Sequence, residues 1–144
     1  TPVFLKVAPD LQPADIDDIV NVAMARGVAA LIVSNTTISR PDLQSKHAGE
    51  TGGLSGAPLR DLAQQRLIDF RKASGGKLGL IGVGGIASAE DAYARIRAGA
   101  SLVQIYSALV YHGPGLALKI NRQLLNLLQR DGFANISDAV GTDA

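Results

Sequence analysis

The sequence contains no cysteine, which excludes disulfide bonds and cysteine-ligated metal sites. Its two histidines, His47 and His112, stand far apart and form no metal-ligand pattern, so we predict no metal site. No apolar run reaches the ~18 residues that a membrane-spanning helix needs, and no signal-peptide pattern is present. Because the chain opens on Thr-Pro and its one methionine is Met24, we expect Thr1 to lie within a longer protein.

An excess of charge of either sign is also missing, since 14 basic residues balance 13 acidic ones. This balance gives no electrostatic reason to expect a nucleic-acid partner. Aromatic residues make up only 4% of the chain, whereas apolar residues make up 47%. Because aromatic residues are few, we expect the core to be built from leucine, isoleucine, valine and alanine. The length suggests a single domain.

Four short apolar runs alternate with segments of helical periodicity. The first helical segment places the apolar residues Ile16, Ile19, Val20, Ala23 and Met24 at helical spacing. Ser88 is the expected N-cap of the third helix, with Asp91 at the reciprocal position of a capping box. The expected strands are 3–9, 29–35, 78–85 and 101–107, and the expected helices are 13–27, 59–74, 88–100 and 115–131.

This alternation indicates an α/β fold with a parallel sheet covered by helices. Two architectures compete at this point: a doubly wound open sheet and part of a (β/α)8 TIM barrel. A complete barrel needs roughly 250 residues, so four strand–helix units would form half of one.

A glycine-rich turn follows the third apolar run. Gly82, Gly84 and Ala87 fit the spacing of a dinucleotide-binding turn. That reading also needs an acidic residue about 20 positions on, and the segment 101–107 (SLVQIYS) contains none. Barrels often hold phosphate in the loops after their last two strands instead. If the fourth run is the eighth strand, the chain is the C-terminal half of a barrel.

Five ordered motifs resemble the dihydroorotate dehydrogenase family, and in detail its class 2, quinone-reducing group. They are LKVAPDL at 5–11, VSNTTISRP at 33–41, ETGGLSGAPLRDL at 50–62, IGVGGIASAEDA at 81–92 and AGASLVQIYSALVYHGPG at 98–115. The resemblance covers about residues 5–139 and implies the C-terminal half of an FMN-binding barrel over residues 1–144. It also implies FMN-dependent oxidation of dihydroorotate to orotate in pyrimidine biosynthesis, with a quinone as electron acceptor.

The resemblance assigns roles to residues of this chain. It implies that Lys6 faces the flavin ring and that Ser34 and Gly56 also bind FMN. The residues expected around the FMN phosphate are Gly84, Gly85, Tyr106 and Ser107. Asn35 and Thr36 match the pair that binds dihydroorotate or orotate, whose ring carbonyls and carboxylate suit amide and hydroxyl groups. Without the family resemblance, Lys6 could be a lysine on an edge strand, and residues 34–37 could serve to cap a helix or form a turn. Tyr106 could be an aromatic residue of the core. Arg60 and Asp61 are expected to be surface charges.

The family's catalytic base is a serine in the N-terminal half, so no catalytic residue is assigned in this chain. We therefore expect the chain alone to be inactive and to bind FMN weakly or not at all. Members of this class attach peripherally to the cytoplasmic side of the membrane through an N-terminal segment that precedes this region. Two alternatives remain: another FMN-dependent barrel oxidoreductase, or a non-catalytic phosphate-binding half-barrel that pairs with itself through its unpaired edges.

Overall fold

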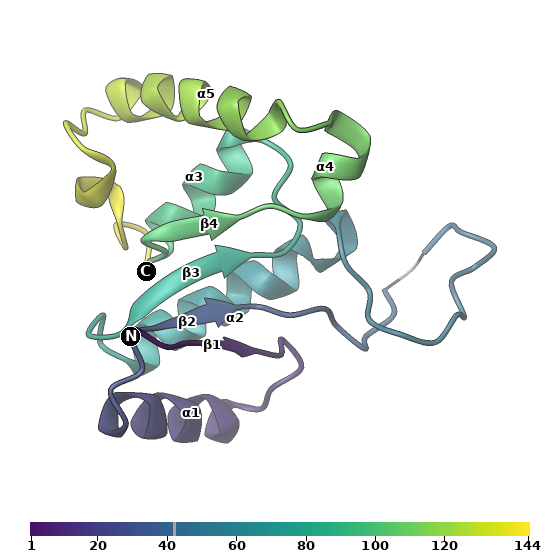
Figure 1. Ribbon diagram of the computed structural model, residues 1–144, viewed down its shortest axis with the longest axis horizontal. Helices are drawn as coiled ribbons and strands as arrows, with labels where there is room; N and C mark the ends of the chain where they lie inside the picture. Colours follow the sequence, from purple (N-terminus) through teal and green to yellow (C-terminus); the bar gives the residue numbers. More distant parts are fainter. Residues whose placement is uncertain (42) are drawn as a thin grey trace.

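The computed structural model describes residues 1–41 and 43–144 as four successive strand–helix units (Figure 1). Each predicted strand and helix is present, with strands shorter than the apolar runs that contain them. The elements are β1 (Phe4–Val7), α1 (Pro13–Ala25), β2 (Ala30–Val33), η1 (Ala57–Leu59), α2 (Arg60–Ala73), β3 (Gly79–Val83), α3 (Ala89–Arg97), β4 (Leu102–Gln104), α4 (Ser107–His112), α5 (Leu116–Arg130) and η2 (Ile136–Ala139).

All four strands are parallel, and their order in the sheet is β1-β2-β3-β4. A doubly wound sheet reverses its strand order at a switch point, and no reversal is found among these strands. Each strand instead lies next to the one that follows it in the chain, as in a (β/α)8 barrel. Of the two architectures that the sequence left open, the strand order selects the barrel.

The two faces of the sheet differ. Successive side chains of a strand point to opposite faces, and the register aligns Lys6, Ile32, Ile81 and Leu102 in one row across the sheet. Lys6 and Leu102, at the two ends of this row, are exposed, and Ile81, although only 5% exposed, belongs to neither of the apolar clusters that pack against helices. This row therefore marks the face that the helices leave uncovered. In a closed barrel this face is the interior, which explains how a lysine can stand in the middle of an apolar strand.

Helices cover the other face in two apolar clusters. The first joins β1–β3 to α1 and α2, and the second joins α3 to α5 and the C-terminal segment. Met24, which stands at helical spacing with the buried residues of α1, is itself 44% exposed. The first cluster contains Val7, Ile16, Val20, Ala23, Leu31, Val33, Leu67, Phe70, Leu78, Leu80, Ala98 and Ala100, and the second Ile86, Ala89, Ala92, Tyr93, Ile96, Leu116, Ile120, Leu124, Leu128 and Ala139.

The N-terminus of α3 has the predicted capping box. The Asp91 N–H donates to Ser88 Oγ at 3.1 Å, and Asp91 Oδ2 accepts from the Ser88 N–H at 3.2 Å. Asp91 Oδ2 also accepts from the Ala87 N–H at 2.9 Å. This carboxylate therefore fixes the segment between β3 and α3 as well as the helix end.

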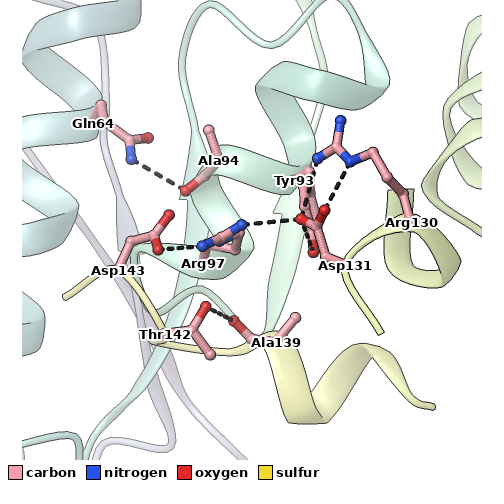
Figure 2. A network of polar contacts seen from close by, with 9 residues as sticks. All are labelled: Gln64, Tyr93, Ala94, Arg97, Arg130, Asp131, Ala139, Thr142 and Asp143. Carbon is pink, nitrogen blue, oxygen red and sulfur yellow. Dashed lines mark hydrogen bonds and ion pairs between the residues drawn. The ribbon is translucent and has the colours of Figure 1, made fainter. Parts of the chain in front are cut away.

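The C-terminal segment, which shows no clear period in sequence, is held against α3 by charged side chains (Figure 2). Arg97 donates to Asp131 at 3.0 Å and to Asp143 at 2.6 Å, and Tyr93 Oη donates to Asp131 at 3.0 Å. The hydrogen bond from Arg130 outweighs partial burial and lowers the pKa of Asp131 to about 2.

Within the described residues no helix is both long and apolar enough to cross a membrane.

Candidate functional site

A cavity of about 370 Å³ lies at the carboxyl ends of the four strands. This is the edge where parallel α/β folds place their ligands. The structure brings all nine residues predicted from the sequence to the lining of this one cavity: Lys6, Ser34, Asn35, Thr36, Gly56, Gly84, Gly85, Tyr106 and Ser107.

The glycine turn after β3 forms one wall. Gly84 and Gly85 have φ values of +114° and +72°, which L-side chains rarely adopt. A Cβ on Gly85 would come within 2.9 Å of the Arg60 backbone nitrogen and within 2.7 Å of its Cα. The turn therefore lies directly against the start of α2, and only glycine fits there.

The backbone amides of this turn are available to a ligand. Among the described residues, no hydrogen-bond acceptor is found for the N–H groups of Gly84 and Gly85. Their carbonyl groups are occupied: Gly84 O accepts from Arg95 at 2.7 Å and Gly85 O from Arg60 at 3.0 Å. A wall with free donors and occupied acceptors suits an anion.

The corner between β4 and α4 forms the adjacent wall. Ser107 is the first residue of α4, so its N–H has no acceptor within the helix, and none is found elsewhere in the described chain. Its hydroxyl is 2.9 Å from the hydroxyl of Ser55, which brings the loop before η1 to the same corner. The alternative interpretation of Tyr106 as a core aromatic is wrong, because Tyr106 is 80% exposed.

Gly56 lies beside this corner. It has a φ of +78°, and a Cβ placed on it would contact Ser107 Cβ at 3.6 Å. The positive φ, and not crowding, is therefore the reason for glycine at this position. Gly56 brings the loop ahead of η1 against the same wall as the corner.

Residues 34–36, which follow β2, form a third wall of the cavity. The Asn35 N–H donates to Val7 O at 2.8 Å and the Ser34 N–H to Val83 O at 3.1 Å, which anchors this segment to both neighbouring strands. Asn35 and Thr36 are exposed, whereas Ser34 is buried and its hydroxyl donates to Asn35 O at 3.0 Å. The side chains predicted to bind substrate are thus accessible from the cavity.

Asp10 fixes the loop that follows this wall. Its carboxylate accepts from Thr37 Oγ1 at 2.5 Å, from Ser39 Oγ at 3.1 Å and from the Ile38 N–H at 3.1 Å. Burial raises the pKa of Asp10, but these hydrogen bonds outweigh it and leave the pKa below its ordinary value. Asp10 therefore remains a carboxylate that ties the end of β1 to the loop after β2.

Lys6 points into the cavity from the uncovered face of the sheet. No carboxylate of the described residues lies within ion-pair distance of its ammonium group. The described residues that line the cavity include no aspartate or glutamate, so Lys6 has no opposing charge there. The described chain also holds no group of three or more possible metal ligands.

Three features of this site were not predicted from the sequence. Arg60 was expected to be a surface charge, but it holds Gly85 O and pairs with Asp91 at 3.1 Å. Arg95 was given no role, although it is only 1% exposed and binds Gly84 O. Gly53 was not singled out, yet a Cβ there would overlap the Thr36 side chain. Arg95 sits on the same face of α3 as Ala92 and Ile96, and this is the signal that could have revealed it.

The parallel sheet in consecutive order, with a cavity at its carboxyl ends, defines a segment of a (β/α)8-barrel protein. The family model "Dihydroorotate dehydrogenase" matches residues 1–128, and the chain belongs to that family. It is 70% identical over 143 residues to the dihydroorotate dehydrogenase (quinone) of Sphingopyxis alaskensis, covering 99% of this chain and 40% of that protein. It is 64% identical to the protein of the same name from Novosphingobium aromaticivorans, with 99% and 41% covered.

Solved structures agree with this assignment. The crystal structure of the Eimeria tenella enzyme (DHODH) in complex with ferulenol matches with a TM-score of 0.95 and 45% identity, over 99% of this chain and 38% of that one. Its ligand-free form matches with a TM-score of 0.94. The barrel fold expected from the sequence is thereby confirmed, and the chain spans about 40% of the length of the curated relatives it matches.

Proposed function

We propose that this chain is the C-terminal half of an FMN-binding barrel, and that the complete protein oxidises dihydroorotate to orotate with a quinone as electron acceptor. The observation that carries this proposal is the meeting of the nine predicted residues around one cavity. The high identity to proteins named dihydroorotate dehydrogenase (quinone) supports the choice of substrate and acceptor.

The residues present fit FMN. The free N–H groups of Gly84, Gly85 and Ser107 would bind its phosphate, because unpaired backbone donors at a glycine turn and a helix start attract anions. Lys6 would lie against the flavin ring, where a cation favours the reduced, anionic ring. The chemistry that bound FMN supplies is acceptance of a hydride from the substrate and delivery of electrons to a quinone.

We assign substrate binding to the wall formed by residues 34–36. The Asn35 amide both donates and accepts hydrogen bonds, and the Thr36 hydroxyl does the same, which matches a planar ring with carbonyl and N–H groups. No residue here is assigned as the base that removes the substrate proton; we place it in the part of the barrel that precedes this chain. Peripheral attachment to the cytoplasmic side of the membrane and a role in pyrimidine biosynthesis follow from the same family relationship.

The test compares the two walls in the complete protein. Asn35→Ala should weaken orotate binding at least tenfold while changing the affinity for FMN by less than threefold, since only the substrate loses a partner. The control is Asn121→Ala on the exposed side of α5, which should change neither. Absence of bound flavin and of dihydroorotate-dependent quinone reduction in the unaltered protein would contradict the proposed function.

A further inference from the structure

Two arginines donate hydrogen bonds to two consecutive carbonyl groups of the glycine turn, from the side of α2 and α3. Arg95 reaches from α3 and donates to Gly84 O at 2.7 Å, and Arg60 reaches from α2 and donates to Gly85 O at 3.0 Å. Arg95 also donates to Arg60 O at 2.6 Å and to the side chain of Gln64. The turn, the start of α2 and the last turn of α3 are thus joined through one buried guanidinium group.

This arrangement determines where the amides of the turn point. In a trans peptide the C=O of one residue and the N–H of the next point in opposite directions, and the bonds after Gly84 and Gly85 are trans. With Gly84 O directed at Arg95, the Gly85 N–H faces away from α2 and α3, towards the cavity side. With Gly85 O directed at Arg60, the same holds for the N–H of Ile86, which also lines the cavity.

Arg95 also places a positive charge close to these amides, on the side away from the cavity. Burial lowers the pKa of Arg95 to about 10, so Arg95 remains a cation at neutral pH. No carboxylate of the described residues forms an ion pair with Arg95, whereas Arg60 pairs with Asp91 at 3.1 Å. A buried cation without a carboxylate partner is costly unless its surroundings supply negative charge or well-placed acceptors.

We propose that Arg95 and Arg60 are positioning residues that make this site select a phosphorylated flavin over the same flavin without phosphate. They act through the peptide bonds after Gly84 and Gly85: each arginine holds a carbonyl group, the N–H groups of Gly85 and Ile86 are presented to the cavity, and the unpaired charge of Arg95 adds attraction for a dianion. This inference rests on the proposed function, because it concerns the same cavity.

The experiment measures the dissociation constants of FMN and riboflavin for the complete protein by flavin fluorescence. The unaltered protein should bind FMN more tightly. Arg95→Met should weaken FMN binding at least tenfold and riboflavin binding less than threefold, because only FMN uses the presented amides. Arg95→Lys should recover part of the loss. Arg60→Met, at a half-exposed position, should lower the preference in the same way if Arg95→Met does not fold.

The control is Arg97→Met. Arg97 lies on the same helix as Arg95, but it binds the C-terminal segment and not the glycine turn (Figure 2). This variant should leave the FMN-to-riboflavin ratio unchanged. Equal losses of both flavins in the Arg95 and Arg60 variants, or an equal change in Arg97→Met, would overturn the inference while leaving the proposed function intact. Failure of the unaltered protein to bind FMN would overturn both.

Discussion

At the scale of single residues, the site depends on close approaches that only small side chains allow. Gly85 lies against the backbone of Arg60, and Gly53 lies against Thr36. The importance of Gly84 and Gly85 could be predicted from their place at the end of an apolar run. That of Gly53 could not, because its partner, Thr36, is 17 positions away in the chain and reaches it only once the loop folds back.

Gly53→Ala tests the coupling between this loop and the substrate wall. The new Cβ would overlap the Thr36 side chain and displace it, so orotate should bind about tenfold more weakly while FMN affinity stays within threefold. Isothermal titration of the complete protein with each ligand measures both effects. Gly49→Ala is the matched control, since a Cβ there meets nothing within 4 Å and its φ is not positive. If Gly53→Ala and Gly49→Ala bind orotate equally well, Thr36 is not held in this way.

At the scale of elements, periodicity and capping residues were sufficient to place the strands and helices. Ser88 and Asp91 identified the start of α3, and the structure confirms it. Spacing alone does not settle burial: Met24 is 44% exposed, because apolar residues at helical spacing can extend beyond the face that a neighbouring helix covers. Arg95 was not predicted from the sequence, because a charged residue on the buried face of a helix is explained only by its partners from other elements.

Replacing the capping serine should destabilise α3 measurably. Ser88→Ala removes the acceptor of the Asp91 N–H and should lower the free energy of unfolding by about 1 kcal/mol. Equilibrium urea unfolding measures this change. Ser101→Ala, at an exposed serine just before β4, should have less than half the effect. Equal losses in the two variants would show that the cap contributes nothing specific.

The contact between α3 and the C-terminal segment should weaken in acid. The pKa of Asp131 is lowered from 3.8 to about 2, so its stabilisation is complete above pH 3.8 and is lost as the pH falls towards about 2. Asp131→Asn should therefore lower the melting temperature at about pH 6, and this difference should shrink by about pH 2. Asp17→Asn, at an exposed carboxylate of α1, serves as the control. A deficit for Asp131→Asn that does not change with pH would contradict the ionic origin.

At the scale of the whole molecule, the sheet has two open edges and one uncovered face. Phe4 on β1 is 52% exposed and Leu102 on β4 is 62% exposed, so each edge strand presents apolar side chains next to unpaired backbone groups. The sequence could predict parallel strands and their helices. It could not predict which face stays uncovered, because that depends on the strand order and register (Figure 1).

The 144-residue chain by itself should associate through these edges. Its apparent mass in sedimentation equilibrium should rise with concentration, and replacing both Phe4 and Leu102 with lysine should reduce the association, because edge lysines discourage strand pairing. Val22→Lys, at a 61% exposed position of α1, should leave the association unchanged. A particle of one chain at every concentration would contradict this prediction.

We propose above all that the glycine turn after β3 and the corner before α4 bind one phosphate together, with Lys6 and Asn35 lining the same cavity. A crystal structure of the complete protein with FMN and orotate tests it most directly. We expect phosphate oxygens within about 3 Å of the Gly85 and Ser107 amide nitrogens, and orotate against Asn35 and Thr36. A phosphate held by another part of the barrel, with these amides facing solvent, would contradict it.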